Sequence, residues 1–589
     1  MIERGYRPAL APLKYPKHAE PFAVLDIEGR DWIHHVLTGT YDGKEYRHFK
    51  RHGDFLRYAF NQPTNQYFAH FGGIYDFLFT LDCALSSLGN YRLIELIPRG
   101  SGILSFTLES GGRRITFRDS SALFPFGLKK LAASFGVVTQ KGELDFSKIR
   151  GITQKLIDYN AADCKALWES LDAFYSTELI RRCGPKTTLA SQAMQFLRTT
   201  LKEKISGLSD GHDYYVRKAY AGGRVEIFRP LFLGPFELHC YDFNSLYPAV
   251  MQSAIPPTEV VDVQDAWNEE DLGFVDCDVE VPDQYMPPLW VREWQDAAGK
   301  PQTKMIFPTG KLRGRWPSVE LKHAIACGAR IVKVRSFLKM RAQGEIFRDF
   351  VTELYALRKS STDPVQNVTA KLLMNSCYGR MGMRKDQEKL ELDMGQAGTP
   401  LPFIQLRSGE IRLIRVPTTS KGFSNVAIAA WITALARIRL HGILRSNSDS
   451  AYYCDTDSIF TTQGLSAGDD LGSLKLEYSV KSACFILPKT YIAGSIVKAK
   501  GIPKEKITAL ALDDFTKALE GDRSALKFDL DQKMLRMRSA IQKGKLLTLS
   551  KSGAIKRIVS SYDKRTLYKD ESGVWNSRPI HFNNWNSVQ

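Results

Sequence analysis

The sequence predicts a multidomain protein of mixed α/β and α+β class, and three observations predict it. The chain has 589 residues, which at a typical ~150 residues per domain corresponds to several compact units. Strand-like apolar runs, such as FAVLDI from Phe22, alternate with helix-like patterns such as Asp158 to Leu171. No internal repeat or low-complexity segment is present. Domain limits therefore have to be placed from motifs and from breaks in the pattern.

The net charge suggests a polyanionic partner. Eighty-one Lys and Arg residues against sixty-four Asp and Glu residues give a formal charge of +17, and basic surfaces attract phosphate backbones. The longest apolar run, Val426 to Ala436, is shorter than the roughly 20 residues that a membrane span needs. The first 21 residues lack the apolar block of a secretory signal. We therefore expect a cytoplasmic protein that contacts no membrane.

The nine cysteines are scattered along the chain. No CxxC pair and no Cys/His group at ligand spacing is present. This pattern favours a reducing compartment and argues against structural zinc.

The elements follow one another in a definite order. Residues 22–175 predict an α/β unit, and 176–235 a connector that contains the turn Tyr220 to Gly223. FELHCYD, from Phe236, alternates like a half-buried strand and opens a second α/β unit. A Pro-, Trp- and Gly-rich insertion follows, and then helical blocks from Glu345 and Val368. The chain ends in a hairpin-like stretch from Gly382, a buried helix NVAIAAWITALARIRL and a basic, separate C-terminal lobe.

Three carboxylates from Asp242 onward suggest metal-dependent phosphoryl transfer. Asp455 and Asp457 stand in a tight turn between two strand-like runs, and Asp242 ends the strand HCYD. A lone Asp-Thr-Asp is more often a solvated hairpin tip. If the two segments are neighbours in one sheet, however, the carboxylates converge and can hold two Mg²⁺ ions roughly 4 Å apart.

The segment AKLLMNSCYGR lies between these carboxylates. As a helix it places Lys371, Asn375 and Tyr378 on one face and turns Leu372 and Leu373 toward the core. Lys371 can then act as a point charge on a triphosphate, although a solvated surface lysine is the plainer interpretation.

A second acidic set occupies the first half. Asp26 and Glu28 are two apart on one strand, which puts both side chains on one face. Asp76 follows GGIY, and Tyr159 and Asp163 are four apart on a helix. Each signal alone describes ordinary surface. Together they suit two-metal hydrolysis of a phosphodiester, with the tyrosine orienting the attacking water.

DFNSLYP, KLLMNSCYG and YCDTDS resemble, in order, the A, B and C motifs of family B DNA polymerases. The resemblance implies that Asp242 and Asp457 are the principal metal ligands, with Asp455 beside them. It assigns nucleotide binding to the turn of motif A and to one face of the motif B helix. The residues are Ser245, Leu246, Tyr247, Lys371, Asn375 and Tyr378. Of these, Tyr247 would exclude a nucleotide that carries a 2′-hydroxyl.

The N-terminal acidic set resembles the 3′→5′ exonuclease motifs of the same family. Asp26, Glu28 and Asp163 would bind metal, with Asp76 and Tyr159 catalytic. Lys141 would contact the scissile phosphate. The second motif departs from the family, because Phe71 stands where asparagine is common. A phenylalanine lacks the amide contact to single-stranded substrate but can stack on a base.

Further motifs resemble the protein-primed branch. Tyr220, Gly222 and Gly223 match its YxGG linker, whose glycines let template DNA approach. Lys489 and Tyr491 match its KxY motif for the primer terminus. The stretch between motifs A and B resembles the insertion that contacts the priming protein, and 382–420 the insertion that encloses DNA and separates strands.

The resemblance implies an RNase H-like exonuclease domain followed by a right-hand polymerase with palm, fingers, thumb and two insertions. The expected partners are template and primer DNA, dNTPs and a terminal protein, for a monomeric enzyme that uses Mg²⁺, which Mn²⁺ can replace. The expected limits are 1–21 tail, 22–175 exonuclease, 176–235 connector, 236–254 palm, 255–337 first insertion, 338–381 fingers, 382–420 second insertion, 421–491 palm and 492–589 thumb.

Three other interpretations stay open at this point. The first is a relative of the same architecture that starts from a nucleic-acid primer or from none. The second is a catalytically silent nucleic-acid-binding scaffold, which would not need two ordered acidic sets. The third is a nuclease with a decayed polymerase half, against which the intact motifs A and C speak.

Overall fold

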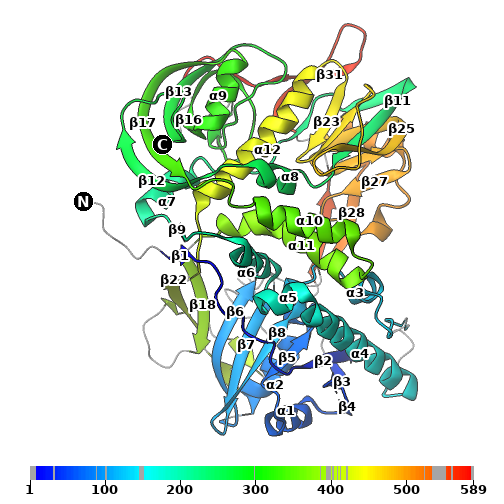
Figure 1. Cartoon of the computed structure of the whole chain (residues 1–589). Coiled ribbons are helices and arrows are strands. Elements are labelled where there is room, and N and C mark those ends of the chain that lie inside the picture. The colour runs from blue at the N-terminus through cyan, green and yellow to red at the C-terminus, as the bar shows by residue number, and fades with distance from the viewer. Residues whose placement is uncertain are drawn as a thin grey trace.

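The computed structural model shows an N-terminal α/β unit below and a larger body above it, joined by a layer of helices (Figure 1). It describes residues 8–585 except 31–33, 88, 100–101, 143, 145–150, 297–298, 385, 393–398, 401–403, 407–408, 412, 420–421, 523, 533–551 and 559–561. A short strand β1 (Ala9–Leu10) leads from the tail and pairs with β9 (Ile205–Ser206) in the connector. The sequence prediction of a mixed α/β and α+β architecture is confirmed at this level.

The N-terminal unit is built on one mixed sheet. Its strands are β2 (Ala23–Arg30), β3 (His34–Tyr41), β4 (Tyr46–Phe49), β5 (Gln66–Ala69), β6 (Arg92–Arg99), β7 (Gly102–Ser110) and β8 (Arg113–Asp119). β5 lies parallel to both β2 and β8, and the other pairs are antiparallel. The helices of the unit are α1 (His52–Asn61), α2 (Asp76–Ser86), α3 (Leu128–Phe135) and α4 (Gln154–Ser176). The strand predicted from Phe22 and the helix predicted over 158–171 are therefore present, and the helix is longer.

The predicted second insertion extends this same sheet. β18 (Asp386–Leu392) pairs with β22 (Leu413–Thr419) as a hairpin and meets β6 where Leu390 faces Leu96. β19 (Thr399–Pro400) adds a further strand at the edge, so the sheet order is β19-β22-β18-β6-β7-β8-β5-β2-β3-β4. β20 (Ile404–Leu406) and β21 (Gly409–Ile411) pair with each other. Within 382–420, residues 385, 393–398, 401–403, 407–408, 412 and 420 lie outside the described residues.

A seven-stranded central sheet forms the middle of the upper body. Its order is β10-β23-β24-β11-β25-β26-β27, with bounds β10 (Val225–Ile227), β11 (Leu231–Phe243), β23 (Ala451–Asp455), β24 (Ser458–Thr461), β25 (Leu474–Leu487), β26 (Thr490–Ala493) and β27 (Ile496–Ala499). β24 pairs with β11 and with β23. The two predicted acidic segments are thus joined in one sheet.

The first insertion is a separate five-stranded sheet of order β12-β17-β13-β16-β32. The strands are β12 (Pro257–Gln264), β13 (Gly273–Val281), β16 (Thr309–Pro317), β17 (Arg330–Ala342) and β32 (His581–Phe582). The helix α9 (Ser318–Ala326) follows β16, and a small hairpin is formed by β14 (Trp294–Gln295) and β15 (Pro301–Gln302). The predicted limit at residue 337 falls inside β17.

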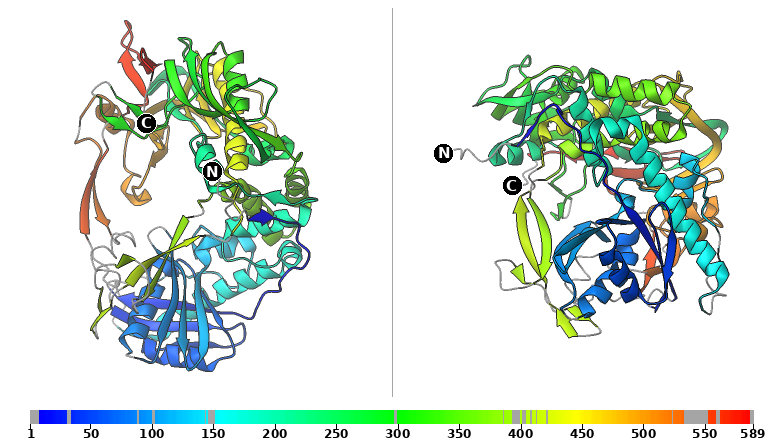
Figure 2. Two further views of the ribbon diagram at one scale, coloured as in Figure 1. Left: turned by 90° about the vertical axis from the view of Figure 1, so that its left-hand side faces the viewer. Right: turned by 60° about the horizontal axis from the view of Figure 1, so that its bottom comes forward.

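The C-terminal lobe is less separate than the sequence suggested. It contains α13 (Leu512–Leu519), β28 (Lys527–Gln532), β29 (Ser552–Arg557), β30 (Arg565–Lys569) and β31 (Trp575–Pro579). β32 joins the insertion sheet, pairing Thr309 with His581. Arg565 is 2% exposed and lies 4.0 Å from Glu226 of β10. The described end of the chain is therefore packed onto the central sheet and the first insertion (Figure 2).

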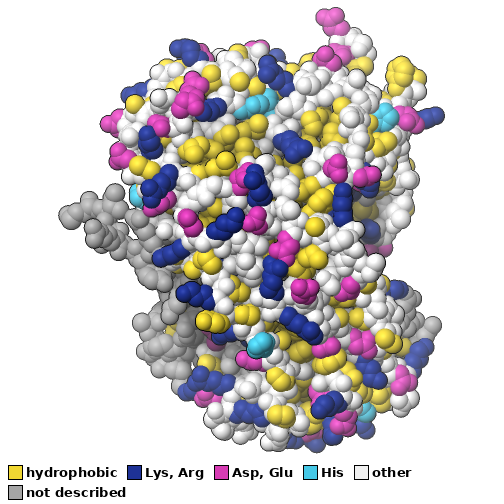
Figure 3. Space-filling view, viewed as in Figure 1, with side chains coloured by type: hydrophobic (Ala, Val, Ile, Leu, Met, Phe, Trp, Pro, Cys, Tyr) yellow, Lys and Arg dark blue, Asp and Glu magenta, His cyan; other side chains and the backbone are white. Residues whose placement is uncertain are grey.

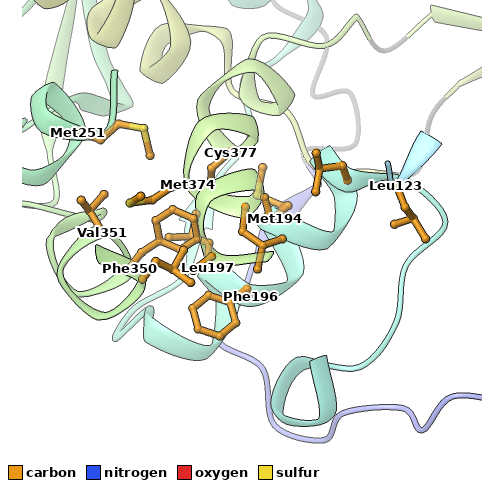
Figure 4. Close-up of a cluster of buried hydrophobic side chains, with 14 of the residues drawn as sticks. Leu123, Met194, Phe196, Leu197, Met251, Phe350, Val351, Met374 and Cys377 are labelled. Carbon is orange, nitrogen blue, oxygen red and sulfur yellow. The ribbon is translucent and has the colours of Figure 1, made fainter. Parts of the chain in front are cut away.

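Helices fill the layer between the two bodies. α5 (Glu178–Cys183), α6 (Leu189–Thr200) and α7 (Asp210–Arg217) come from the connector, and α8 (Leu246–Ser253) follows β11. α10 (Arg348–Ser360) and α11 (Pro364–Met381) form the predicted helical block. Their buried side chains meet those of α6 and α8 in one apolar cluster that includes Phe196, Met251, Phe350 and Met374 (Figure 4). This cluster fixes the position of α11 relative to β11.

The buried helix predicted from Asn425 is α12 (Val426–Ser446), and Asn425 caps it by accepting a hydrogen bond from the backbone N–H of Ala427. By length and composition α12 passes as a membrane span, but 72% of its apolar window is buried inside the protein. It is the core helix of the upper body. All nine cysteines are free, and only Cys83 is not fully buried.

Candidate active sites

The polymerase-type carboxylates gather at one edge of the central sheet. Both Asp242 of β11 and Asp455 of β23 are registered with Ser458 of β24. Asp457 occupies the turn between β23 and β24, and its carbonyl accepts a hydrogen bond from the N–H of Phe243 at 2.8 Å. This register brings the two motifs together although more than 200 residues separate Asp242 from Asp455.

The electrostatics of this edge favour a bound cation. Burial and the neighbouring charges of Asp457 and Glu477 raise the pKa of Asp242 to about 6. Burial and the charge of Asp455 also raise the pKa of Asp457. Both carboxylates are therefore destabilised as anions unless positive charge lies beside them.

Asp455 already has such a partner. The Lys489 ammonium lies 2.9 Å from its carboxylate, and the hydroxyl of Tyr453 accepts a hydrogen bond from the N–H of Lys489 at 2.9 Å. Thr456 and Lys489 both have positive φ, at 66° and 61°, a strained conformation for residues other than glycine. Asp242 and Asp457 thus remain the two carboxylates most available to a metal ion.

The nucleotide-binding residues predicted around motif A and in α11 come together. The rings of Tyr247 and Tyr378 stack with centroids 4.4 Å apart and planes 12° apart. Lys371 and Asn375 are exposed on the same helix, and Leu373 is buried. Leu372 is half-buried against the core, as predicted. Leu246 is buried at the start of α8, and Ser245, at φ 58°, forms the turn that precedes it.

The YxGG turn lies directly beside motif C. A side chain at Gly223 would place its Cβ 2.6 Å from Thr456 Cγ2, whereas one at Gly222 would meet nothing within 4 Å. The N–H of Thr456 donates to the carbonyl of Arg224 at 2.8 Å. The backbone at Gly222 is therefore open to close approach, whereas a side chain at Gly223 would collide with the turn that carries Asp457.

Two other motif residues occupy positions that sequence reasoning did not foresee. The Tyr220 ring packs against Gly382 at the end of α11, where a Cβ would come within 2.7 Å of it. Tyr491, predicted to hold the primer terminus, is 3% exposed, and its ring packs among Tyr453, Phe460 and Phe485. All four residues of β26 are buried, Tyr491 among them. The contact of Tyr491 with the primer terminus stays a prediction. Lys489 is accessible, with its side chain 53% exposed.

The exonuclease-type carboxylates form a compact cluster. One oxygen each of Asp26, Glu28 and Asp163 lies within 4.8 Å of the others. Burial is the main cause that raises the pKa of all three groups, and that of Glu28 reaches about 7. Asp163 Oδ1 is buried and has no hydrogen-bond partner. An orphaned, buried acceptor in a carboxylate cluster fits a divalent cation.

Asn160 organises this cluster, and sequence reasoning missed it. Its amide donates to Asp26 Oδ2 at 2.8 Å and to Glu28 Oε1 at 3.2 Å. The hydroxyl of Tyr46 donates to the Asn160 carbonyl oxygen at 2.9 Å. Asn160 lies three residues before Asp163 on α4, so helical spacing could have identified it.

Asp76 has a supporting position. Its carboxylate accepts a hydrogen bond from the N–H of Ile27 at 2.8 Å, between the two acidic residues of β2. Lys141 forms an ion pair with Asp163 and lies 5.2 Å above the ring of Tyr159. The predicted lysine, tyrosine and aspartate therefore meet at the cluster.

Phe71 stands at the rim in an unusual conformation. Its φ is 58°, and its N–H donates to Asp119 at 3.0 Å. The ring is 38% exposed and packs edge-on against His70. A partly exposed aromatic ring is able to stack on an unpaired base, and that contact stays a prediction.

Two cationic side chains near the polymerase site were also missed. Arg437 of α12 donates to the carbonyls of Ala221 and Gly222 at 2.7 and 2.8 Å and is held by Glu320 of α9. Arg358 of α10 donates to the Ser245 hydroxyl at 3.4 Å. Their partners are distant in sequence, so no local pattern marks them. On the face in Figure 3 the basic side chains are spread among acidic ones.

Comparisons with known proteins agree with this geometry. A family model described as "DNA polymerase type B, organellar and viral" matches residues 147–394. A probable DNA polymerase of Ascobolus immersus is 27% identical over 543 residues, which cover 76% of this chain and 43% of the relative. A probable DNA polymerase of Podospora anserina is 25% identical, and the match covers 83% of this chain and 48% of the relative. The chain thus spans less than half the length of these fungal relatives.

The fold and the two carboxylate sites agree with these comparisons: the chain is similar to the type B DNA polymerases of organelles and viruses. Within that class it is similar to the DNA polymerase of Bacillus phage phi29, at 25% identity over 71% of this chain and 73% of the relative. The phi29 polymerase solved with primer-template DNA and incoming nucleotide shares the fold. The TM-score is 0.69 at 19% identity, and the match covers 91% of this chain and 99% of the phi29 chain.

Proposed function

We propose that the protein is a DNA-directed DNA polymerase with a separate 3′→5′ exonuclease site. The observation that carries the proposal is the pairing of β24 with both β11 and β23, which brings Asp242 and Asp457 together beside the stacked Tyr247 and Tyr378. The similarity to the phi29 polymerase, which has been solved with primer-template DNA and nucleotides, supports it.

The chain supplies the parts that nucleotide addition needs. Asp242 and Asp457 would hold divalent cations, which stabilise the charge that develops on the phosphates during phosphoryl transfer. Lys371 on the exposed face of α11 is the point charge for the triphosphate. The stacked Tyr247 forms a rigid floor under the sugar, which accounts for exclusion of a 2′-hydroxyl.

The second site is proposed to remove mispaired nucleotides. Asp26, Glu28 and Asp163 would hold the cations, and their buried cluster supports this role. Lys141 and Tyr159 lie where they can contact the scissile phosphate and the attacking water. The two sites belong to different sheets, so each can be removed by itself.

Initiation and elongation belong to the same proposal. We infer that synthesis starts from a hydroxyl of a terminal protein and continues by strand displacement. The Arg292 contact that joins the first insertion to the YxGG turn and the hairpin that extends the N-terminal sheet support this, as does the similarity to phi29 polymerase. The alternative is that synthesis starts from a nucleic-acid primer or without any primer. A monomeric state and a cytoplasmic location stay predictions.

Extension of a primed single-stranded circle tests the core of the proposal. The reaction contains Mg²⁺, four dNTPs and a DNA trap, and it compares the wild type with Asp457→Asn and Asp26→Ala. We expect products longer than one circle from the wild type and from Asp26→Ala, and none from Asp457→Asn. Only Asp26→Ala should lose degradation of single strands.

Each result has a definite meaning. Absence of synthesis by the wild type, or full synthesis by Asp457→Asn, would overturn the polymerase assignment. Products limited to one circle would support the polymerase assignment but exclude strand displacement. Degradation that persists in Asp26→Ala would refute the exonuclease site.

A further inference from the structure

Helices α9 and α12 meet along three successive polar pairs. Glu320 bonds to Arg437, His323 to His441, and Cys327, just beyond α9, to Arg445. The spacing on each helix is three or four residues, which aligns the pairs along one interface. α9 belongs to the first insertion and α12 is the core helix of the upper body, so the pairs join two units (Figure 1).

The middle of this interface contains a group of soft and borderline metal-ligand atoms. His323 Nε2 lies 2.7 Å from His441 Nδ1 and 3.8 Å from Cys327 Sγ. The three atoms all lie within 4.8 Å of one another. Imidazole and thiolate ligands select zinc-like ions, whereas carboxylate sites suit Mg²⁺. The group is therefore chemically distinct from both carboxylate sites.

Hydrogen bonds orient the ligand atoms toward one point. The backbone carbonyl of Met286 can only accept, so His441 Nε2 carries the proton of their 2.8 Å hydrogen bond. His441 Nδ1 is then unprotonated and accepts the hydrogen bond from His323 Nε2, and a carbonyl fixes the histidine tautomer in the same way in metal sites. The Arg445 guanidinium donates to Cys327 Sγ at 3.5 Å, a contact that opposes the rise that burial causes in the pKa of this thiol.

We propose that His323, Cys327 and His441 bind one Zn²⁺ ion that clips the first insertion to the core helix α12. Binding releases the proton of the Cys327 thiol. The proton that now lies between the two imidazoles moves to His323 Nδ1, which frees Nε2 as a ligand. Three protein ligands leave a fourth position for water, and His323 is partly exposed there.

This site was not foreseen, because His323 and Cys327 are four apart while His441 is 118 residues away from His323. The absence of a Cys/His group at ligand spacing led to the prediction that structural zinc is lacking. The fold supplies the third ligand from another helix. The inference is independent of the proposed polymerase activity.

Cobalt substitution tests the site on the whole chain. Metal-free protein is titrated with Co²⁺ in excess Mg²⁺, which fills the carboxylate sites with a spectroscopically silent ion. We expect one equivalent of Co²⁺ to give a thiolate-to-metal charge-transfer band that one equivalent of Zn²⁺ removes. Cys327→Ser should lose the band, and Cys83→Ser, in the N-terminal unit, should retain it.

A measurement on the wild type keeps the test decisive if Cys327→Ser does not fold. One equivalent of Zn²⁺ should slow alkylation of Cys327 at least tenfold in the folded protein, as read by mass spectrometry, and raise the melting temperature. No charge-transfer band and no protection of Cys327 would overturn the proposal. An unchanged band in a folded Cys327→Ser variant would do the same.

Discussion

Phe71 shows how one residue can affect both stability and the proposed exonuclease site. It adopts φ 58°, which costs an ordinary residue about 1 kcal/mol and which asparagine tolerates better. Phe71→Asn should therefore raise the free energy of unfolding by up to about 1 kcal/mol. It should also speed degradation of single strands several-fold, because the amide can hydrogen-bond the substrate.

Denaturant unfolding and the degradation rate of a single-stranded oligonucleotide check this prediction. Phe71→Ala is the matched control: it removes the ring without supplying an amide and should slow degradation. If both variants degraded DNA equally, the amide would have no part in holding the substrate.

Gly223 is constrained by the catalytic turn. An added methyl group would lie 2.6 Å from Thr456 Cγ2, closer than atoms can pack, and would displace the turn that carries Asp457. Gly223→Ala should lower nucleotide incorporation at least tenfold and leave degradation of single strands unchanged. Gly222→Ala, whose methyl group meets nothing within 4 Å, is the control in a primer-extension assay. Equal incorporation by the two variants would contradict the role of this contact.

At the scale of elements, the α9–α12 interface depends on a buried ion pair. Glu320 and Arg437 are 2% and 3% exposed, so Glu320→Met leaves a buried charge without its partner. This should cost about 3–5 kcal/mol of stability. Replacing both residues by methionine should restore most of that loss. Nucleotide incorporation by the double variant should be lower than that of the wild type, because the carbonyls of Ala221 and Gly222 lose the Arg437 hydrogen-bond donor.

Denaturant unfolding and primer extension on the two variants separate these effects. Recovery of both stability and incorporation in the double variant would show that Arg437 has no positioning role at the YxGG turn. Recovery of neither would show that the methionines do not pack.

The hairpin of β18 and β22 is an added edge of the N-terminal sheet. Its removal, with residues 386–419 replaced by a short Gly-Ser linker, leaves β6 to β8 and β2 to β5 paired among themselves. We expect extension on single-stranded template and Asp26-dependent degradation to persist and strand displacement to be lost. A circle carrying an annealed downstream strand measures this. Strand displacement by the deletion variant at the wild-type rate would show that the hairpin has no part in strand displacement.

The elements show what could be predicted from the sequence. Turn residues and alternation placed Asp455, Asp457 and Asp242 at strand ends, and helical spacing placed Lys371 and Tyr378 on one face. Contacts between distant segments were beyond such patterns. Nothing local connects Glu320 to Arg437 or His323 to His441, and no local pattern shows that all four residues of β26, Tyr491 among them, are buried.

At the scale of the whole molecule, a buried histidine couples stability to pH. Burial lowers the pKa of His52 to about 3, whereas an unfolded histidine titrates near 6.5. Between these values the unfolded chain binds more protons, so stability is complete above about pH 6.5 and falls as the pH drops toward 3. The slope from this group is at most about 1.4 kcal/mol per pH unit.

Melting temperatures between pH 7 and pH 4.5 test the coupling. His52→Gln should be less steep than the wild type, because glutamine cannot take up the proton. His48→Gln, at an exposed position, should follow the wild type. Identical slopes for all three proteins would exclude His52 as the cause.

The pairing of β18 with β6 also bears on how the chain is made. Residues 92–99 emerge from the ribosome long before residues 386–392, so β6 is an unprotected sheet edge for much of synthesis. Such an edge can recruit strands from neighbouring nascent chains. The Pro98 within β6, which lacks an N–H to donate, and the charged Arg92, Glu95 and Arg99 make it a poor template. The hairpin thus closes late over an edge that is already guarded against aggregation.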